Sequence, residues 1–111
     1  MDGLKDLHCV PPETFPGPMD ASACTQAAEE LHVDWSLDLD SGRISRELRF
    51  ADYYQTMAFV NAVAWVAHQQ DHHPDMEVHF NRCVVHFSTH AVGGLSRNDF
   101  ICAARIDALF V

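Results

Sequence analysis

The sequence predicts an α+β domain with two layers, in which a four-stranded antiparallel sheet carries its helices on one face. Two pairs of segments alternate between apolar and polar residues with a period of two, as half-buried strands do. Segments with helical apolar spacing lie before, between and after these pairs. The predicted order is therefore helix, hairpin, helix, hairpin, helix.

The first 19 residues are expected to form an extended arm that does not pack, because four of the five prolines fall within residues 11–18. A single folded domain is expected to cover residues 20–111. It begins with a short helix, for which either Asp20 or Ser22 is a suitable N-cap residue.

The first hairpin is predicted from two alternating segments, residues 33–39 and 43–50, which are joined by the turn Asp40-Ser41-Gly42-Arg43. Each segment presents apolar residues on one side and polar residues on the other. Arg46 interrupts the apolar side of the second segment.

Residues 52–70 contain no glycine or proline and are predicted to form a long helix. Apolar residues run along two sides of this helix. One side can pack on the sheet, and the other is expected to pack on a second copy of the chain, because apolar surfaces of this size usually mark interfaces. We therefore expect a homo-oligomer, either a dimer or a tetramer.

Pro74 disfavours helical geometry at the residue before it, so the long helix is expected to end at about Asp71 or His72. The second hairpin is predicted from residues 76–80 and 83–89, with a turn near Asn81-Arg82.

A last helix is predicted after Gly93-Gly94. Ser96 and Asp99 form a capping box with Asp in place of the usual Glu. The buried face of this last helix is expected to contain Cys102, Ala103, Ile106, Leu109 and Phe110.

Composition excludes several classes of function. The 111 residues include 48% apolar residues and carry a net charge of −9, the wrong sign for a protein that neutralises phosphates, so direct nucleic-acid binding is not expected. No apolar run approaches the roughly 18 residues of a membrane span. The first residues do not resemble a secretory signal, and the four cysteines show no Cys-x-x-Cys pair, so we expect a cytoplasmic protein with reduced thiols.

Eight histidines are unusual for a small acidic domain, and most of them fall between His68 and His90. His72 and His73 are expected to point in different directions, because Pro74 holds His73 in an extended conformation. Ring nitrogens of the two imidazoles, pointing in different directions, could then contact two sides of one small ligand.

Three interpretations of these histidines compete. Surface histidines are common, and this ordinary role is favoured for His8, His32, His79 and His86. His68-x-x-x-His72 could supply two zinc ligands, although no cysteine or glutamate stands at the expected spacing. Acid–base catalysis without a metal is the third interpretation, since an imidazole titrates near pH ~6.5 and two neighbours can hold opposite protonation states.

Several short motifs combine in the second half of the chain: His68-Gln69-Gln70-Asp71-His72-His73-Pro74-Asp75, Phe80-Asn81, Ser88-Thr89-His90, Gly93-Gly94-Leu95-Ser96 and Asp99. Trp35, the segment Ile44-x-Arg46-x-Leu48-x-Phe50-x-Asp52-Tyr53 and residues 62–67 extend the pattern upstream. Over about residues 20–110 the chain resembles the pterin-4a-carbinolamine dehydratases, also called 4a-hydroxytetrahydrobiopterin dehydratases.

The resemblance implies the same α+β fold, dimers or tetramers, and a hydro-lyase activity that needs no metal or cofactor. The family removes water from the 4a-hydroxytetrahydropterin made by aromatic amino acid hydroxylases and so returns quinonoid dihydropterin for tetrahydrobiopterin recycling. Some members also bind a homeodomain transcription factor and stabilise its dimer, which makes a binding module the alternative function.

The resemblance also implies roles for particular residues. His72 and His90 correspond to the acid–base pair, and His73 to a substrate-binding histidine. Supporting roles are expected for Pro74, Ser88, Thr89, Asp99 and His68. Pro74 sets the bend, Ser88 and Thr89 offer polar groups to the pterin edge, and Asp99 either caps the last helix or takes part in catalysis.

Three residues depart from the family pattern. His68 stands where many members carry Glu, Met76 where an aromatic residue is frequent, and Ala91 where an acidic residue often follows Thr-His. The last change removes a carboxylate beside His90 and is expected to lower its basicity.

Overall fold

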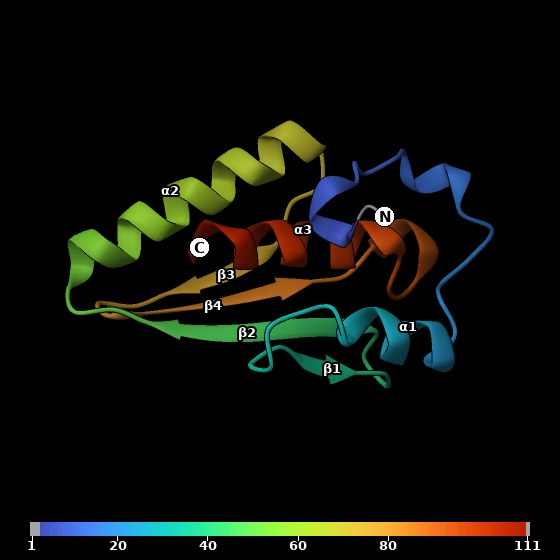
Figure 1. Ribbon diagram of the computed structural model, residues 1–111, viewed down its shortest axis with the longest axis horizontal. Coiled ribbons are helices and arrows are strands. Elements are labelled where there is room, and N and C mark those ends of the chain that lie inside the picture. Colours follow the sequence, from blue (N-terminus) through green and yellow to red (C-terminus); the bar gives the residue numbers. More distant parts are fainter. Residues whose placement is uncertain (1–2, 111) are drawn as a thin grey trace.

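The computed structural model describes residues 3–110, which form two layers (Figure 1). One layer is a sheet with the strand order β1-β2-β4-β3, in which every neighbouring pair is antiparallel. The other layer holds the helices. In chain order the elements are α1 (Ala21–Ala28), β1 (Ser36–Asp38), β2 (Arg43–Arg49), α2 (Tyr53–Gln70), β3 (Asp75–Val78), β4 (Arg82–Phe87) and α3 (Arg97–Asp107). The predicted fold class and element order are confirmed.

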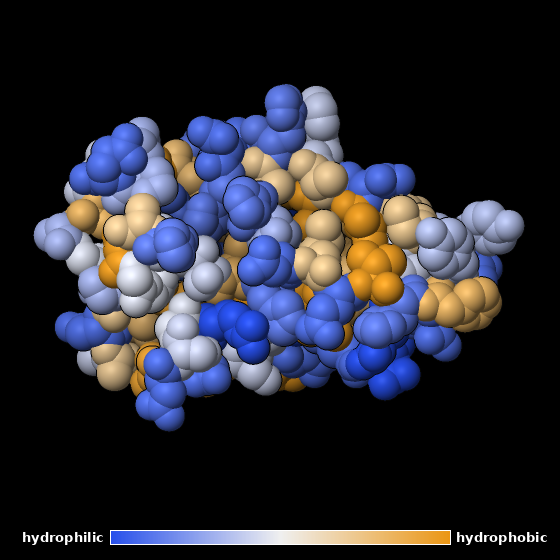
Figure 2. All heavy atoms as spheres, turned by 180° about the vertical axis from the view of Figure 1, so that it is seen from behind, coloured by the Kyte–Doolittle hydropathy of each residue, from blue (hydrophilic) through white to orange (hydrophobic). Residues whose placement is uncertain are grey.

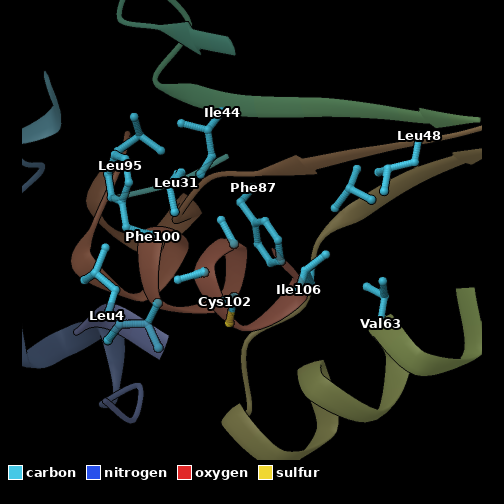
Figure 3. Packing of buried hydrophobic residues seen from close by; sticks show 14 of the residues in the cluster. Leu4, Leu31, Ile44, Leu48, Val63, Phe87, Leu95, Phe100, Cys102 and Ile106 are labelled. Atoms are coloured by element: carbon cyan, nitrogen blue, oxygen red, sulfur yellow. The ribbon is translucent and has the colours of Figure 1, made fainter. Parts of the chain in front are cut away.

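The core lies between the central strands and α3 (Figure 3). Alternate residues of β4, which are Cys83, Val85 and Phe87, are fully buried against the helices. They meet Phe100 and Ile106 of α3, which are also fully buried. Burial of this kind contributes about 1.5–3 kcal/mol for each large apolar side chain, so α3 is anchored firmly and can position polar groups at its N-terminus.

Helix α2 begins and ends as its sequence predicts. The Asp52 side chain caps it by accepting a hydrogen bond of 2.8 Å from the backbone N–H of Gln55. At the other end Asp71 adopts a left-handed conformation (φ 52°), and the N–H of His72 donates to the carbonyl of Ala67 across 3.2 Å. This Schellman closure stops the helix at Gln70, three residues before His73.

Strand β1 is shorter than the alternating segment 33–39 predicted. Trp35 leaves the sheet pattern because its indole N–H donates to Asp107 on α3 across 2.8 Å. Val33 is almost fully exposed, at 90% of its surface. Arg46, which interrupted the apolar side of β2, forms an ion pair of 2.6 Å with the same Asp107.

The N-terminal segment corrects the expectation of an arm that does not pack. Residues Leu4–Asp6 form a 3₁₀ turn that packs on α3, with the Leu4 side chain buried. Val10 and Asn98 exchange two hydrogen bonds, of 3.1 and 2.7 Å, between the Val10 backbone and the Asn98 side chain. The prolines exclude long helices and strands from this segment, but they do not prevent its other backbone groups from bonding to α3.

The end of the last helix also differs from the prediction. Helix α3 stops at Asp107, and a 3₁₀ turn follows, so Leu109 and Phe110 are about half exposed rather than buried. The view from behind mixes hydrophilic and apolar side chains, with a cluster of apolar ones right of centre (Figure 2). Across residues 3–110, no helix is both long and apolar enough to cross a lipid bilayer.

Candidate active site

A cleft of about 420 Å³ lies where α2 ends and β4 runs into the following loop. It contains the three histidines that the sequence singled out, His72 and His73 from one segment and His90 from another. The lining residues are Pro12, Asp71, His72, His73, Asp75, His86, Ser88, Thr89, His90 and Ala91. Imidazoles from two distant segments therefore converge on one space.

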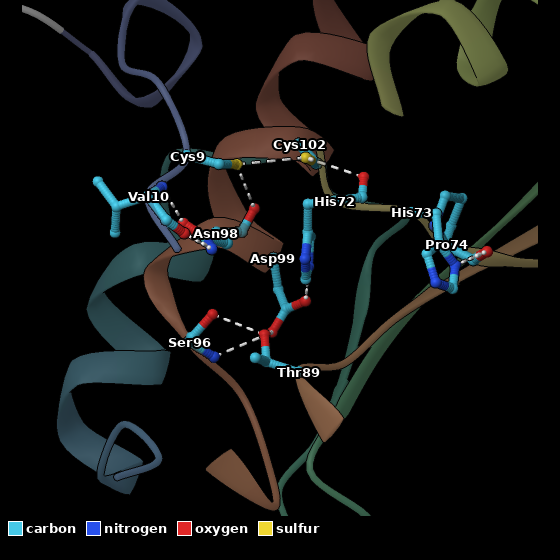
Figure 4. Close-up of polar contacts among 10 residues, drawn as sticks. All are labelled: Cys9, Val10, His72, His73, Pro74, Thr89, Ser96, Asn98, Asp99 and Cys102. Carbon is cyan, nitrogen blue, oxygen red and sulfur yellow. Dashed lines mark hydrogen bonds and ion pairs between the residues drawn. The ribbon is translucent and has the colours of Figure 1, made fainter. Parts of the chain in front are cut away.

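His72 is held on several sides (Figure 4). Its Nε2 lies 2.6 Å from Oδ1 of Asp99. Its ring stacks on Phe87, with an interplanar angle of 13° and a centroid distance of 5.9 Å. Among the described residues, no protein group bonds to Nδ1 of His72. The ring orientation is thus fixed, and Nδ1 is the nitrogen left for a ligand.

Asp99 is completely buried and uses both carboxylate oxygens. Oδ1 faces His72, while Oδ2 accepts hydrogen bonds from the Thr89 hydroxyl (2.8 Å) and the Ser96 backbone N–H (2.9 Å). The predicted capping box is therefore present, with Ser96 as its N-cap residue. The two roles considered for Asp99 do not exclude each other, because the capping carboxylate also contacts His72 (Figure 4).

The environment of His72 favours its charged form. Burial of the ring disfavours a positive charge, but the hydrogen bond to Asp99 and the negative charge of Asp99 outweigh burial and raise the pKa of His72. Cys9 and Asp71 add smaller contributions in the same direction. The imidazolium form therefore persists to a higher pH than it would in water.

The His73 ring lies apart from the His72 ring, beside Pro74 (Figure 4). The left-handed Asp71 ends the helix, and Pro74 follows directly after His73. The His73 ring is exposed, and its Nδ1–H can donate to the Pro74 carbonyl across 3.3 Å. One imidazole of the pair is therefore anchored in the protein, and the other lies at the mouth of the cleft.

His90 lies on a loop that closes on itself. The N–H of Thr89 donates to the Gly94 carbonyl across 2.8 Å, and Gly93 adopts a left-handed conformation (φ 71°) that only glycine takes without strain. The His90 ring is exposed and has no hydrogen-bond partner within residues 3–110. It is free to contact a ligand in the cleft.

Thr89 and His68, two of the residues given supporting roles, have different surroundings. The Thr89 hydroxyl is buried and contacts Ser96 and Asp99, so it supports the Asp99 carboxylate and is not open to the cleft. His68 does not line the cleft. Its ring packs on Trp65 with a centroid distance of 5.4 Å, beside a neighbouring hollow that Pro74 also lines. Ser88 is exposed within the cleft as expected.

His86 is a cleft residue that the sequence interpretation assigned to an ordinary surface role. Its Nε2 lies 2.6 Å from Glu77 and its Nδ1 lies 2.6 Å from the Ser45 hydroxyl. The hydrogen bond from His86 lowers the pKa of Glu77. The strand alternation already placed His86 opposite Cys83, Val85 and Phe87, but it did not reveal that this face leads into the cleft.

Within residues 3–110, no group of three or more His, Cys, Asp or Glu side chains is arranged to hold a metal ion. His68 and His72, the pair considered for zinc, point to different surroundings, since His72 contacts Asp99 and His68 packs on Trp65.

Known proteins share both the sequence and the fold. Residues 17–109 match the family model described as pterin 4 alpha carbinolamine dehydratase. A relative from Nitrosomonas eutropha (strain DSM 101675 / C91 / Nm57), named for this dehydratase family, is 52% identical over 97% of this chain and 94% of its own. Another so named, from Stenotrophomonas maltophilia (strain K279a), is 64% identical over 96% of this chain and 90% of its own.

Two solved structures are similar. The crystal structure of a transcriptional coactivator/pterin dehydratase from Brucella melitensis has a TM-score of 0.78 and 26% identity, covering 84% of this chain and 98% of that one. A pterin dehydratase-like protein that is a RuBisCO assembly factor in the alpha-carboxysome has a TM-score of 0.60 and 23% identity, covering 70% and 90%, and shows the shared fold alone. By the family model and these relatives, the chain belongs to the pterin 4 alpha carbinolamine dehydratase family.

Proposed function

We propose that this protein dehydrates 4a-hydroxytetrahydropterins to quinonoid dihydropterins in the cytoplasm, by histidine acid–base catalysis without a metal or cofactor. The observation that carries the proposal is the convergence of His72, His73 and His90 on one cleft, with His72 bound to the buried Asp99. Family membership supports the same reaction class.

The reaction requires one proton donor and one proton acceptor. The C4a–O bond breaks and the hydroxyl leaves as water, while N5 loses its proton and the C4a=N5 double bond forms. The site must therefore hold an acid near the hydroxyl and a base near N5. Two positioned groups of this kind each contribute roughly 10² to 10⁴ in rate.

His72 is the better candidate for the acid. Asp99 holds Nε2 and raises the pKa of the ring, so Nδ1–H of the imidazolium is available to protonate the leaving hydroxyl. His90, exposed on its loop and without a partner in the described residues, is then the base that takes the N5 proton. His73 is assigned to substrate binding at the mouth of the cleft.

Alanine variants test the assignment. His72→Ala and His90→Ala are expected to lower kcat/KM for the carbinolamine by about 10²-fold or more, with the oligomer and the fold intact. His79→Ala is a matched control, because this exposed histidine lies on the hairpin outside the cleft. Unchanged turnover in both cleft variants would exclude these histidines as the acid–base pair.

We also propose that the functional protein is a homodimer or homotetramer that receives its substrate from an aromatic amino acid hydroxylase. Exposed aromatic residues on α2 support self-association, since Tyr54 and Trp65 are 82% and 60% exposed. Size-exclusion chromatography with light scattering tests this, and Trp65→Glu is expected to reduce the oligomer. A monomeric wild-type chain would contradict it.

The alternative function is a binding role, in which the same exposed aromatic residues would contact a partner protein. The Brucella protein is described as a transcriptional coactivator as well as a pterin dehydratase. The histidine variants separate the two functions. A binding role would survive His72→Ala and His90→Ala and would be weakened by Trp65→Glu. Dehydration, in contrast, would be lost in the two histidine variants.

A further inference from the structure

Two of the four free cysteines lie next to each other behind the active site. The Sγ atoms of Cys9, in the N-terminal segment, and Cys102, in α3, are 3.6 Å apart (Figure 4). A disulfide needs about 2.05 Å, so closure requires an approach of about 1.5 Å. The other two, Cys24 in α1 and Cys83 in β4, are buried elsewhere in the fold.

The backbone around Cys9 is fixed on both sides. The N–H of Cys9 donates to Oε1 of Gln70 across 2.8 Å, and the guanidinium of Arg105 donates to the Leu7 carbonyl across 3.0 Å. The two hydrogen bonds between Val10 and Asn98 follow directly. The sulfur pair is thus held in place by contacts from α2 and α3 rather than brought together by chance.

The two thiols have unequal reactivity. The hydrogen bond from Cys102 lowers the pKa of Cys9 against the effect of burial, and the positive charges of His72 and Arg105 lower it further, with Asp99 opposing them. The same hydrogen bond, together with burial, raises the pKa of Cys102. Cys9 is half-buried and Cys102 fully buried, so Cys9 is the thiolate that an oxidant reaches first.

We propose that Cys9 and Cys102 form a peroxide-sensitive dithiol that closes to a disulfide between the N-terminal segment and α3. The Cys9 thiolate attacks hydrogen peroxide, so that an S–O bond forms, the O–O bond breaks and hydroxide leaves. The Cys102 sulfur then attacks the sulfur of the Cys9 sulfenic acid, so that the S–S bond forms, the S–O bond breaks, and the hydroxyl leaves as water with the proton of the Cys102 thiol. In total two thiols lose two electrons and two protons, and one peroxide becomes two water molecules.

The disulfide would alter the surroundings of the active site. The Cys102 thiol contacts the His72 carbonyl at 3.8 Å, and the segment that carries Cys9 continues to Pro12 in the wall of the cleft. Oxidation removes the thiol proton from the contact between Cys102 and the His72 carbonyl. It also links the segment that leads to Pro12 covalently to α3. The modification and the cleft are therefore physically connected, although the sulfur chemistry does not depend on dehydration.

Mass spectrometry tests the proposal directly. The reduced full-length chain is treated with hydrogen peroxide and then unfolded in urea, so that N-ethylmaleimide blocks all remaining thiols, and it is digested without reductant. The expected result is a peptide pair linked through Cys9 and Cys102, two maleimide adducts in place of four, and reversal by dithiothreitol. In native protein the link is expected to form at least about tenfold faster than in concentrated urea, because the fold holds the sulfurs together.

Single variants provide matched controls. Cys24→Ser and Cys83→Ser should keep the link, and Cys9→Ser should abolish it. In Cys102→Ser, or Cys102→Ala if the serine variant does not fold, Cys9 should accumulate a sulfenic acid that dimedone traps. Four maleimide adducts after peroxide, a link between other cysteines, or equal rates in native protein and in urea would overturn the proposal.

Discussion

His72 and Asp99 are joined by a hydrogen bond of 2.6 Å between Nε2 and a carboxylate oxygen that has no exposed surface. The bond connects the residue that follows α2 with the first turn of α3. The other oxygen of Asp99 accepts a hydrogen bond from the backbone N–H of Ser96, the N-cap residue of α3. A single carboxylate therefore both orients the imidazole and caps a core helix. The carboxylate that orients the ring is therefore itself held in place at the start of α3.

Replacement of this carboxylate should change the ionisation of His72. Asp99→Asn retains the size of the side chain but loses the negative charge, so the pKa of His72 is expected to fall, and NMR titration of its Cε1–H measures the change. Dehydratase kcat/KM near neutral pH should fall about tenfold or more, because less imidazolium is present. Thr89→Ser, which keeps the hydroxyl donor to Asp99, should leave both quantities nearly unchanged. An unaltered titration of His72 in Asp99→Asn would refute the claim that Asp99 raises the pKa of His72.

The same contact makes stability depend on pH. The folded pKa of His72 is raised above the roughly 6.5 of an unfolded histidine, so its stabilising contribution is fully present below that value and is lost as pH rises through the folded pKa. Urea denaturation across this range should show that wild type loses its advantage over Asp99→Asn as pH increases. A constant difference between the two proteins would contradict the prediction.

Gly42 lies in the first hairpin turn and packs against the loop that carries His90. Its φ of 67° disfavours other residues, and a Cβ there would lie 2.8 Å from the Cα of Gly94. Gly42→Ala is expected to lower the free energy of unfolding by about 2 kcal/mol and to reduce turnover by displacing the loop. Gly17→Ala, where no atom lies within 4 Å, serves as the control and should have little effect.

Asp107, the last residue of α3, binds side chains of β2 and of the segment before β1. It accepts hydrogen bonds from Arg46 and from the Trp35 indole, and the Arg46 side chain is only 11% exposed. Asp107→Ala leaves the Arg46 charge buried without a partner and should cost about 3 kcal/mol or more in urea denaturation. Glu47→Ala breaks an exposed ion pair with Arg82 and should change stability little. Similar losses in both variants would show that burial of Arg46 does not set the cost.

Local patterns were sufficient to predict most of the fold. The alternation in β2 and β4 and the end of α2 before Pro74 depend on residues within a few positions of one another. The side-chain period of a strand or helix fixes which residues share a face, so a single sequence carries that information. The motif around His72, His73 and His90 likewise singled out three residues that line the cleft.

What the sequence by itself determined was the set of elements, their order and the histidines at their ends. Only the tertiary structure decided that Asp99 serves His72 as well as its helix, that His86 enters the cleft while His68 stays outside, and that the proline-rich N-terminal segment packs on α3. Those contacts join residues far apart in the chain. They depend on how apolar faces pack against one another, which local periodicity does not specify.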